Sequence, residues 1–242
     1  MKKNLVFFLL PFAVFGQDVD KKSSYYDWFD QVLGREHTGL YNGKQYVDLD
    51  INRIHDNKNA FFLSDKVMNG SVMYDGQTYH NIGMKYNLEK DILLVTLKSG
   101  TTVSIIQLIR DKIDEFTIDG YRFIRITDIL EDNTSINGFY EVLVEDSSFS
   151  LLKKNKKNRR KNIQAGRLLS YEFASANSYI LLMNKKYKKV TTAKADIIKI
   201  FPEHKKEIKQ FYEAYKRLRK SEPDTFMQRL FKKIVNPSSS SI

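Results

Sequence analysis

The stretch Phe116-Thr117-Ile118-Asp119-Gly120-Tyr121-Arg122-Phe123 contains the pattern that decides the fold of this chain. Asp119-Gly120 favours a type I′ turn, because both central residues of that turn need positive φ and its twist matches a right-handed pair of strands. A two-residue turn here pairs Phe116 with Phe123 and puts both rings on one face, while their neighbours point away. We therefore predict a β-hairpin centred on this dipeptide.

The same pattern, an apolar residue, Asx-Gly and an aromatic residue three positions later, occurs at Tyr41–Tyr46 and Tyr74–Tyr79. A weaker copy, Met183–Tyr187, has lysine in place of the glycine. The spacing between copies is irregular, so the pattern indicates a run of hairpins and not a solenoid. The turn residues predicted with glycine are Asn42, Gly43, Asp75, Gly76, Asp119 and Gly120.

Further β-rich runs lie between these hairpins, and Lys98–Thr101 is a plausible turn between two of them. Together they predict about a dozen short strands, as in an antiparallel sandwich or a closed or half-open barrel. The pattern does not choose among these. The runs are Ala60–Leu63, Ile92–Leu97, Thr102–Leu108, Phe139–Val144 and Ser178–Met183.

The hydrophobic period changes from two to about 3.6 after Thr191. Ala195–Phe201 predicts a helix, and Pro202 fits the first turn of the next one. Two apolar stripes then follow at three- and four-residue intervals, and Ser221 with Pro223 marks the start of the second. The fold class predicted is α+β, mainly β, with a C-terminal helical segment packed on the sheet. The stripes are Ile208, Phe211, Tyr212, Tyr215 and Leu218, then Phe226, Met227, Leu230, Phe231 and Ile234.

The first sixteen residues have the features of a secretory signal peptide. Lys2 and Lys3 precede an apolar run, Leu5–Phe15, that is too short to span a bilayer, and Gly16 precedes a plausible cleavage site. We expect an exported protein, periplasmic or extracellular, with no transmembrane span in the mature chain. The chain has no cysteine, so neither a lipoprotein anchor nor a disulfide can form. The expected organisation is a signal peptide (1–16), a β domain (17–192), C-terminal helices (193–235) and a frayed tail (236–242).

Charge is distributed unevenly along the chain. Residues 17–150 contain 14 Lys/Arg and 22 Asp/Glu, whereas residues 151–242 contain 24 and 7, so that the net charges are −8 and +17. An acidic front and a basic back indicate either that the two parts face each other or that the basic part meets an anionic partner.

The densest cluster of charge has seven basic residues in nine. Such a run resists packing, so we predict an exposed loop after a strand ending near Leu152. It is a candidate anion-binding site for anionic lipid, lipopolysaccharide or polysaccharide, with a solvated loop as the alternative. The export signal argues against nucleic acid. The candidates are Lys153, Lys154, Lys156, Lys157, Arg159, Arg160 and Lys161.

No motif predicts a metal site, a cofactor or catalytic residues. Asp48–Asn52 resembles the start of a calcium loop, but Arg53 replaces the required glycine, and the alternation fits a half-buried strand better. The four histidines have no metal-ligand spacing. The aromatic cluster Tyr25–Phe29 could stack on a sugar ring or, alternatively, dock its segment on the core.

Gly70–Thr96, with Tyr74-Asp75-Gly76 and Tyr86–Leu93, resembles secreted β-rich envelope proteins of Gram-negative bacteria that have no characterised function. The later segment Gly138–Leu143, and Phe201-Pro202 before a basic helix, are similar to them as well. The residues that carry this resemblance are hairpin and packing residues. The resemblance therefore implies an exported β-rich fold and transfers no catalytic residue.

These observations lead to three hypotheses of function. The first is a non-enzymatic envelope protein for binding or scaffolding, whose basic C-terminal part is attracted to anionic envelope components or to another envelope protein. The second is a carrier or chaperone whose curved sheet surrounds a lipid or other apolar ligand. The third is a hydrolase with a site assembled from distant segments.

Overall fold

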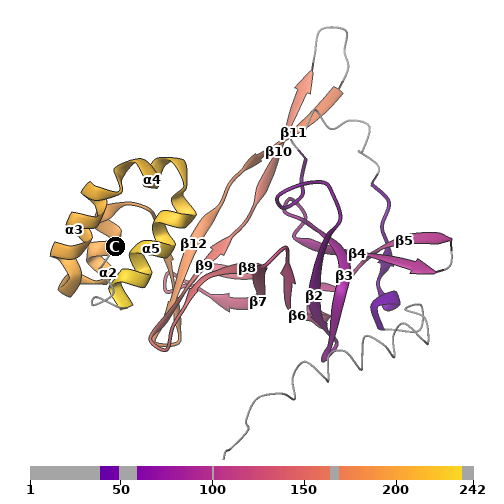
Figure 1. Ribbon diagram of the computed structural model, residues 1–242, viewed down its shortest axis with the longest axis horizontal. Helices are drawn as coiled ribbons and strands as arrows, with labels where there is room; N and C mark the ends of the chain where they lie inside the picture. Colours follow the sequence, from indigo (N-terminus) through magenta and orange to yellow (C-terminus); the bar gives the residue numbers. More distant parts are fainter. Residues whose placement is uncertain (1–38, 49–58, 100, 164–168, 236–242) are drawn as a thin grey trace, which may run out of the picture.

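The computed structural model describes residues 39–48, 59–99, 101–163 and 169–235 (Figure 1). The signal peptide, the Tyr25–Phe29 cluster, most of the Asp48–Asn52 segment and the tail 236–242 lie outside the described residues, so these predictions remain predictions.

Most strands belong to one antiparallel sheet of 11 strands, in the order β1-β5-β4-β3-β2-β6-β7-β8-β9-β12-β13, which is not closed into a barrel. Two further strands form a separate ribbon, β10-β11. The strands are β1 (Lys44–Gln45), β2 (Met68–Tyr74), β3 (Gln77–Asn87), β4 (Ile92–Ser99), β5 (Thr102–Gln107), β6 (Ile113–Ile118), β7 (Tyr121–Ile129), β8 (Ser135–Glu145), β9 (Phe149–Lys154), β10 (Lys157–Ile163), β11 (Leu169–Ser175), β12 (Ser178–Met183) and β13 (Lys186–Val190).

Three of the predicted hairpins are confirmed with the predicted registers. Tyr74 pairs with Gln77, Ile118 with Tyr121, and Met183 with Lys186, so each turn has two central residues. Both central residues have positive φ in every case, including 49° and 81° at Asp119 and Gly120. Local turn chemistry is sufficient here because each turn joins two strands with matching apolar alternation.

Valine at Gly76 or Gly120 should destabilise the protein by at least ~1 kcal/mol, because a β-carbon disfavours positive φ. A β-carbon at either position would meet nothing within 4 Å, so the effect isolates backbone strain from steric overlap. Urea midpoints provide the measurement. Lys185→Gly is the reverse control: Lys185 has φ of 60°, and glycine there should raise the midpoint. Unchanged midpoints for both valine variants would contradict this account.

The hairpin predicted at Asn42-Gly43 is wrong. Gly39–Asn42 forms a 3-10 turn, η2, and β1 pairs with the distant strand β5. A β-carbon on Gly43 would lie 2.4 Å from the carbonyl oxygen of Gln107, so this glycine permits a close approach of two backbones. The dipeptide makes no hairpin because the residues before it do not alternate as a strand does.

The strand predicted at Ala60–Leu63 is replaced by a single bridge. Phe61 pairs with Asn87, and Phe62 N–H donates to the Tyr86 carbonyl at 2.8 Å. Leu63 then adopts φ of 52° and ends the pairing.

The first half of the sheet curves around an aromatic core. The rings of Phe116 and Phe123 stack 4.8 Å apart with 9° between their planes, and Tyr86 and Phe139 meet Phe116 edge-on at 5.3 and 5.2 Å. All four side chains are fully buried. This cluster joins β3, β6, β7 and β8. The hairpin centred on Asp119-Gly120 therefore contributes two of the rings in the centre of the core.

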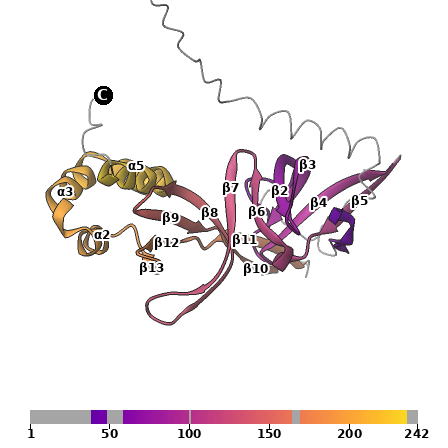
Figure 2. The same ribbon diagram turned by 90° about the horizontal axis from the view of Figure 1, so that it is seen from below.

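The C-terminal helices begin near the predicted places and cover one face of the last strands (Figures 1 and 2). The first apolar stripe, however, is divided between two helices, which meet at Tyr215. Pro202 occupies the first position of a short 3-10 turn, η5 (Pro202–His204), that leads into α3. The second apolar stripe, on α5, is fully buried, whereas Tyr215 in the first stripe is 37% exposed. No helix in the described ranges is long and apolar enough to cross a membrane. The helices are α2 (Lys194–Ile200), α3 (Lys205–Ala214), α4 (Lys216–Ser221) and α5 (Pro223–Val235).

The opposite face of the last strands is covered by the β7-β8 hairpin. Ile126, Leu130 and Ile136 from this hairpin pack on Leu152 and Ile180. The hairpin reaches β13 through a parallel bridge between Leu130 and Tyr187. The molecule is therefore elongated, with the helices at one end, β1–β6 at the other and β8–β9 between them (Figure 2).

Candidate functional site

The basic run Lys153–Lys161 is not an exposed loop. Its residues form the end of β9 and most of β10, and four of its seven cations are buried or half-buried. β10 pairs with β11 and continues the β9-β12 pair as a long ribbon, in which Ala176 N–H donates to the Lys156 carbonyl at 2.8 Å. The loop prediction was wrong because carboxylates from distant segments compensate these charges, which allows the run to pack.

Lys153 points toward the helices and is only 7% exposed at its side chain. Its Nζ lies 2.5 Å from Oδ2 of Asp224 in α5 and 3.8 Å from Oε2 of Glu141 in β8. The Tyr179 hydroxyl donates to the other Asp224 oxygen at 2.6 Å, and the Asn155 amide donates to Glu141 at 2.6 Å. Burial raises the pKa of Glu141, against the opposing effects of Asn155 and Lys153.

Lys154 points to the other face of the sheet. Its Nζ donates to Asp91 Oδ2 at 2.8 Å and to the Phe139 carbonyl at 3.1 Å. The Tyr86 hydroxyl donates to Asp91 Oδ1 at 2.5 Å, and burial followed by the charge of Asp91 raises the Tyr86 pKa well above its ordinary value. Burial lowers the pKa of Lys154. This ion pair attaches the β3-β4 turn to β8 and β9.

Lys157 and Arg159 hold the ribbon against the first half of the sheet. The Lys157 ammonium donates to the carbonyls of Asn59 and Phe61 at 2.9 and 2.7 Å. Arg159 forms two hydrogen bonds with the Glu89 carboxylate, at 2.7 and 3.0 Å, and its guanidinium lies 4.7 Å from the Tyr171 ring centroid. Both cations therefore make internal contacts, and only Lys156, Arg160 and Lys161 of the run are exposed.

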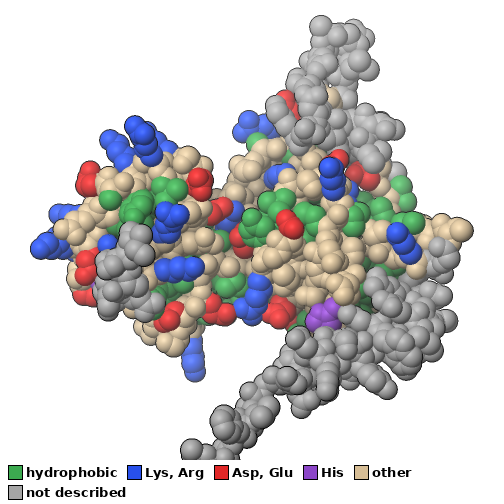
Figure 3. All heavy atoms as spheres, in the orientation of Figure 1, with side chains coloured by type: hydrophobic (Ala, Val, Ile, Leu, Met, Phe, Trp, Pro, Cys, Tyr) green, Lys and Arg blue, Asp and Glu red, His purple; other side chains and the backbone are tan. Residues whose placement is uncertain are grey.

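A second concentration of exposed positive charge lies on α4, which the sequence analysis included only as part of the basic C-terminal segment. Residues 214–221 contain Lys216, Arg217, Arg219 and Lys220 and no carboxylate. Three of these cations are exposed, and Arg219 lies over the Tyr212 ring at 5.4 Å. Within the described ranges, no acidic group lies within 4.0 Å of them. We call these four cations the α4 basic surface; Figure 3 shows many Lys and Arg side chains on the end of the molecule that the helices form.

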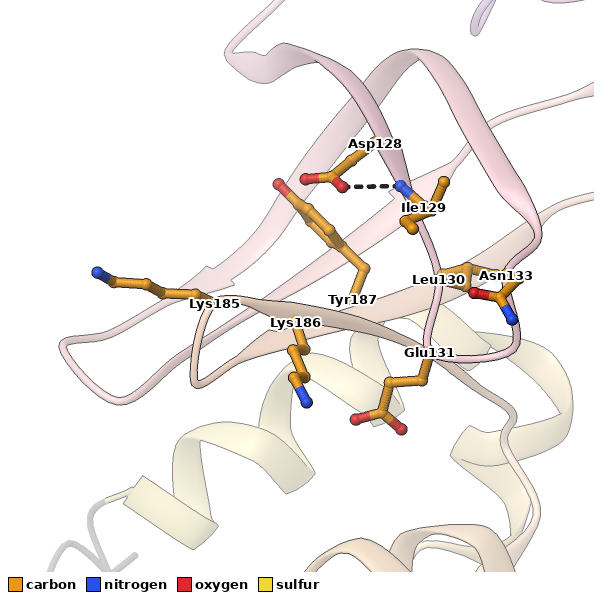
Figure 4. Close-up of a pocket in the computed structure, with 8 residues that line it drawn as sticks. All are labelled: Asp128, Ile129, Leu130, Glu131, Asn133, Lys185, Lys186 and Tyr187. Carbon is orange, nitrogen blue, oxygen red and sulfur yellow. Dashed lines mark hydrogen bonds between the residues drawn. The ribbon is translucent and has the colours of Figure 1, made fainter.

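A pocket of about 400 Å³ lies where the β7-β8 turn meets the β12-β13 hairpin (Figure 4). We call it the seam pocket; its lining residues are Asp128, Ile129, Leu130, Glu131, Asn133, Lys185, Lys186 and Tyr187. The contact is maintained by Glu131 N–H, which donates to the Tyr187 carbonyl at 2.9 Å.

The polar groups of the seam pocket do not converge on one point. Figure 4 shows the Tyr187 hydroxyl beside the Asp128 carboxylate, whereas Lys186 and Glu131 extend away from them. Burial and the charge of Asp128 raise the pKa of Tyr187. Two carboxylates and two ammonium groups give the walls no net charge, so the pocket selects neither anions nor cations.

The histidines do not assemble a site in the described structure. His204 pairs with Glu207 at 2.8 Å in the first turns of the helical unit, and His80 lies on β3. His37 and His55 lie outside the described residues. Across those that are described, no group of three His, Asp or Glu side chains could hold a metal ion.

Comparison with known proteins adds no function to this geometry. No protein-family model, curated protein or solved structure matches the chain.

Proposed function

We propose that this chain is an exported, non-enzymatic envelope protein that binds an anionic envelope component through the α4 basic surface. The observation that carries the proposal is the contrast between the two basic segments. In Lys153–Lys161, the best-buried cations are compensated inside the fold, whereas the cations of α4 face solvent without a carboxylate partner among the described residues.

The position of α4 supports a binding role. The helix lies next to α5 in the helical end of an elongated molecule (Figure 1). Leu218 packs on the helical core and α4 adjoins α5, so the cations are presented by an ordered element. Each basic residue near an anionic surface contributes about 1 kcal/mol of attraction, which makes four adjacent cations sufficient for measurable binding.

The carrier hypothesis has less support. A lipid chain needs an apolar cavity, but the curved half of the sheet is filled by Tyr86, Phe116, Phe123 and Phe139. The seam pocket has mixed charge, and a second pocket, beside Arg159, has a volume of about 10 Å³, which is room for a water molecule.

The proposal is tested by binding of the mature chain to two anionic probes, vesicles containing phosphatidylglycerol and immobilised heparin. The triple variant Lys216→Gln, Arg217→Gln, Lys220→Gln should lose about tenfold or more in affinity for both probes. Binding of the unmodified chain should weaken steeply between about 0.1 M and about 1 M salt, because the Debye length falls from about 10 Å to about 3 Å.

The matched control removes the same number of charges from the exposed part of the sequence-predicted site: Lys156→Gln, Arg160→Gln, Lys161→Gln. Lys157 and Arg159 stay unchanged because they hold internal contacts. The control should bind both probes within about twofold of the unmodified chain, since three distant charges are largely screened. Equal losses for the two triple variants would contradict a surface centred on α4, and unchanged binding of the α4 variant would refute the proposal.

A further inference from the structure

Tyr215 lies at the junction of α3 and α4, immediately before the α4 basic surface. Its side chain is 37% exposed, and it is followed directly by Lys216 and Arg217. The backbone bonds Tyr215 N–H to Phe211 O at 2.9 Å and Arg219 N–H to Tyr215 O at 3.1 Å continue through the junction. The hydroxyl of Tyr215 makes no hydrogen bond within the described part of the chain.

A column of aromatic rings supports Tyr215 from the core. The ring of Tyr215 lies 4.4 Å from that of Phe211, which in turn lies 5.3 Å from that of Phe226. Phe226 is fully buried and Phe211 nearly so. An exposed ring that rests on a buried column has little freedom to fold away, so the exposed part of Tyr215 is held next to the α4 cations at a small entropic cost.

An exposed tyrosine beside several cations offers a lipid bilayer two contacts, of which a soluble polyanion without an apolar layer can use only the electrostatic one. The cations are attracted to anionic headgroups, and the ring places its apolar body in the interface while the hydroxyl stays in water. A soluble polyanion offers only the charges. Tyr215 should therefore strengthen binding to an anionic bilayer but not to a soluble polyanion.

We propose that the anionic component bound by α4 is a phospholipid bilayer, and that Tyr215 enters its headgroup layer. This inference rests on the proposed function. It adds one contact, between an aromatic ring and the lipid interface, that electrostatic attachment alone does not need.

The first test is Tyr215→Ser, measured on vesicles of equal parts phosphatidylglycerol and phosphatidylcholine and, separately, on heparin. Affinity for the vesicles should fall by about fivefold, because the ring loses its apolar contact, while affinity for heparin stays the same. The matched control is Tyr121→Ser. Tyr121 is 41% exposed and also makes one ring contact, with Phe62, but it lies on β7 far from the helices.

The second test places a fluorescent reporter at the same position. Trp28 is the chain's single tryptophan, so the double variant Trp28→Phe, Tyr215→Trp has one indole, immediately before the α4 basic surface. Its emission should shift to the blue on addition of the phosphatidylglycerol vesicles and should be quenched by brominated lipid, and heparin should cause neither change.

The outcomes separate this inference from the proposed function. If the α4 triple variant loses binding but Tyr215→Ser does not, or if Tyr215→Ser weakens heparin and vesicle binding equally, α4 binds anions and the bilayer inference is wrong. An unshifted emission from the vesicle-bound fluorescent variant also overturns it. Failure of the unmodified chain to bind either probe refutes the proposed function itself.

Discussion

Replacing Gly138 with alanine should destabilise the protein by about 4 kcal/mol. Gly138 lies in β8 with φ of 115°, a conformation that L-residues rarely adopt. A β-carbon there would lie 1.8 Å from Asp91 Oδ2 and 2.5 Å from Lys154 Nζ. Alanine would therefore combine backbone strain with separation of a half-buried ion pair.

The consequence would extend beyond one contact, because Asp91 also accepts the hydrogen bond of the buried Tyr86 hydroxyl. Urea midpoints and near-ultraviolet circular dichroism would measure the loss, and a variant that no longer folds also meets the expectation. Gly83→Ala is the matched control. Its β-carbon would meet the exposed side chain of Val67 at 2.9 Å, which can move, and its cost should stay below about 1 kcal/mol. A midpoint for Gly138→Ala equal to that of the control would contradict the account.

Replacing Asp224 with asparagine should destabilise the protein by about 2 kcal/mol. The substitution leaves the ammonium of Lys153 buried with only Glu141, at 3.8 Å, as a carboxylate neighbour. Removal of one partner of a fully buried pair costs about 3 to 5 kcal/mol, and the smaller figure reflects the partial exposure of Asp224. The loss should appear as a lower urea midpoint at pH 7.

Glu141→Gln provides the contrasting variant in the same cluster. The pKa of Glu141 is raised mainly by burial, so its ionisation is less favourable in the folded than in the unfolded chain. The protonated Glu141 carboxyl contributes fully to stability below its ordinary pKa. This contribution is lost as the pH rises through the raised pKa of the folded chain. Glutamine does not ionise, so the variant keeps its stability as the pH rises. Its side-chain oxygen can still accept the hydrogen bond from the Asn155 amide. The variant should therefore be more stable than the parent at pH 7 and equal to it below about pH 4, where Glu141 is protonated in both states.

Urea midpoints of both variants between about pH 4 and about pH 8 would test this pair of predictions. Comparison with the parent at each pH removes the contributions of all other titrating groups. Destabilisation by Glu141→Gln as large as that by Asp224→Asn at pH 7 would contradict the expected gain and would show that Lys153 requires Glu141 as much as Asp224.

Lys153 and Lys154 act together as a connection between the two ends of the molecule. They are adjacent on β9 and point to opposite faces, so that one pairs with α5 and the other with the β3-β4 turn. A strand is the only regular element that sends consecutive side chains to opposite faces. The strand geometry of β9 thus explains why two neighbouring lysines can hold two separate layers.

Short-range features of the fold could be predicted from the sequence. The turns at Asp75-Gly76, Asp119-Gly120 and Asn184-Lys185 formed because a type I′ turn depends on two residues and on the alternation of the strands beside it. The helices formed at the predicted places because Pro202 and Pro223 fix φ at the beginning of a turn and the apolar stripes repeat every 3.6 residues. Asn42-Gly43 shows the limit of such reasoning, since the dipeptide fits a turn but its neighbours supply no strand to pair.

Only the tertiary structure decided which charges are internal and which are free. The sequence determined that Lys153–Lys161 is strongly basic, but its carboxylate partners, Glu89, Asp91 and Asp224, lie 63 to 71 residues away along the chain. Charge density along a sequence predicts repulsion between neighbours, whereas the free energy of a buried cation depends on the groups that the fold brings within hydrogen-bonding distance. The same reason explains why three of the four cations on α4 remain exposed, since no carboxylate of the described residues lies within 4.0 Å of them.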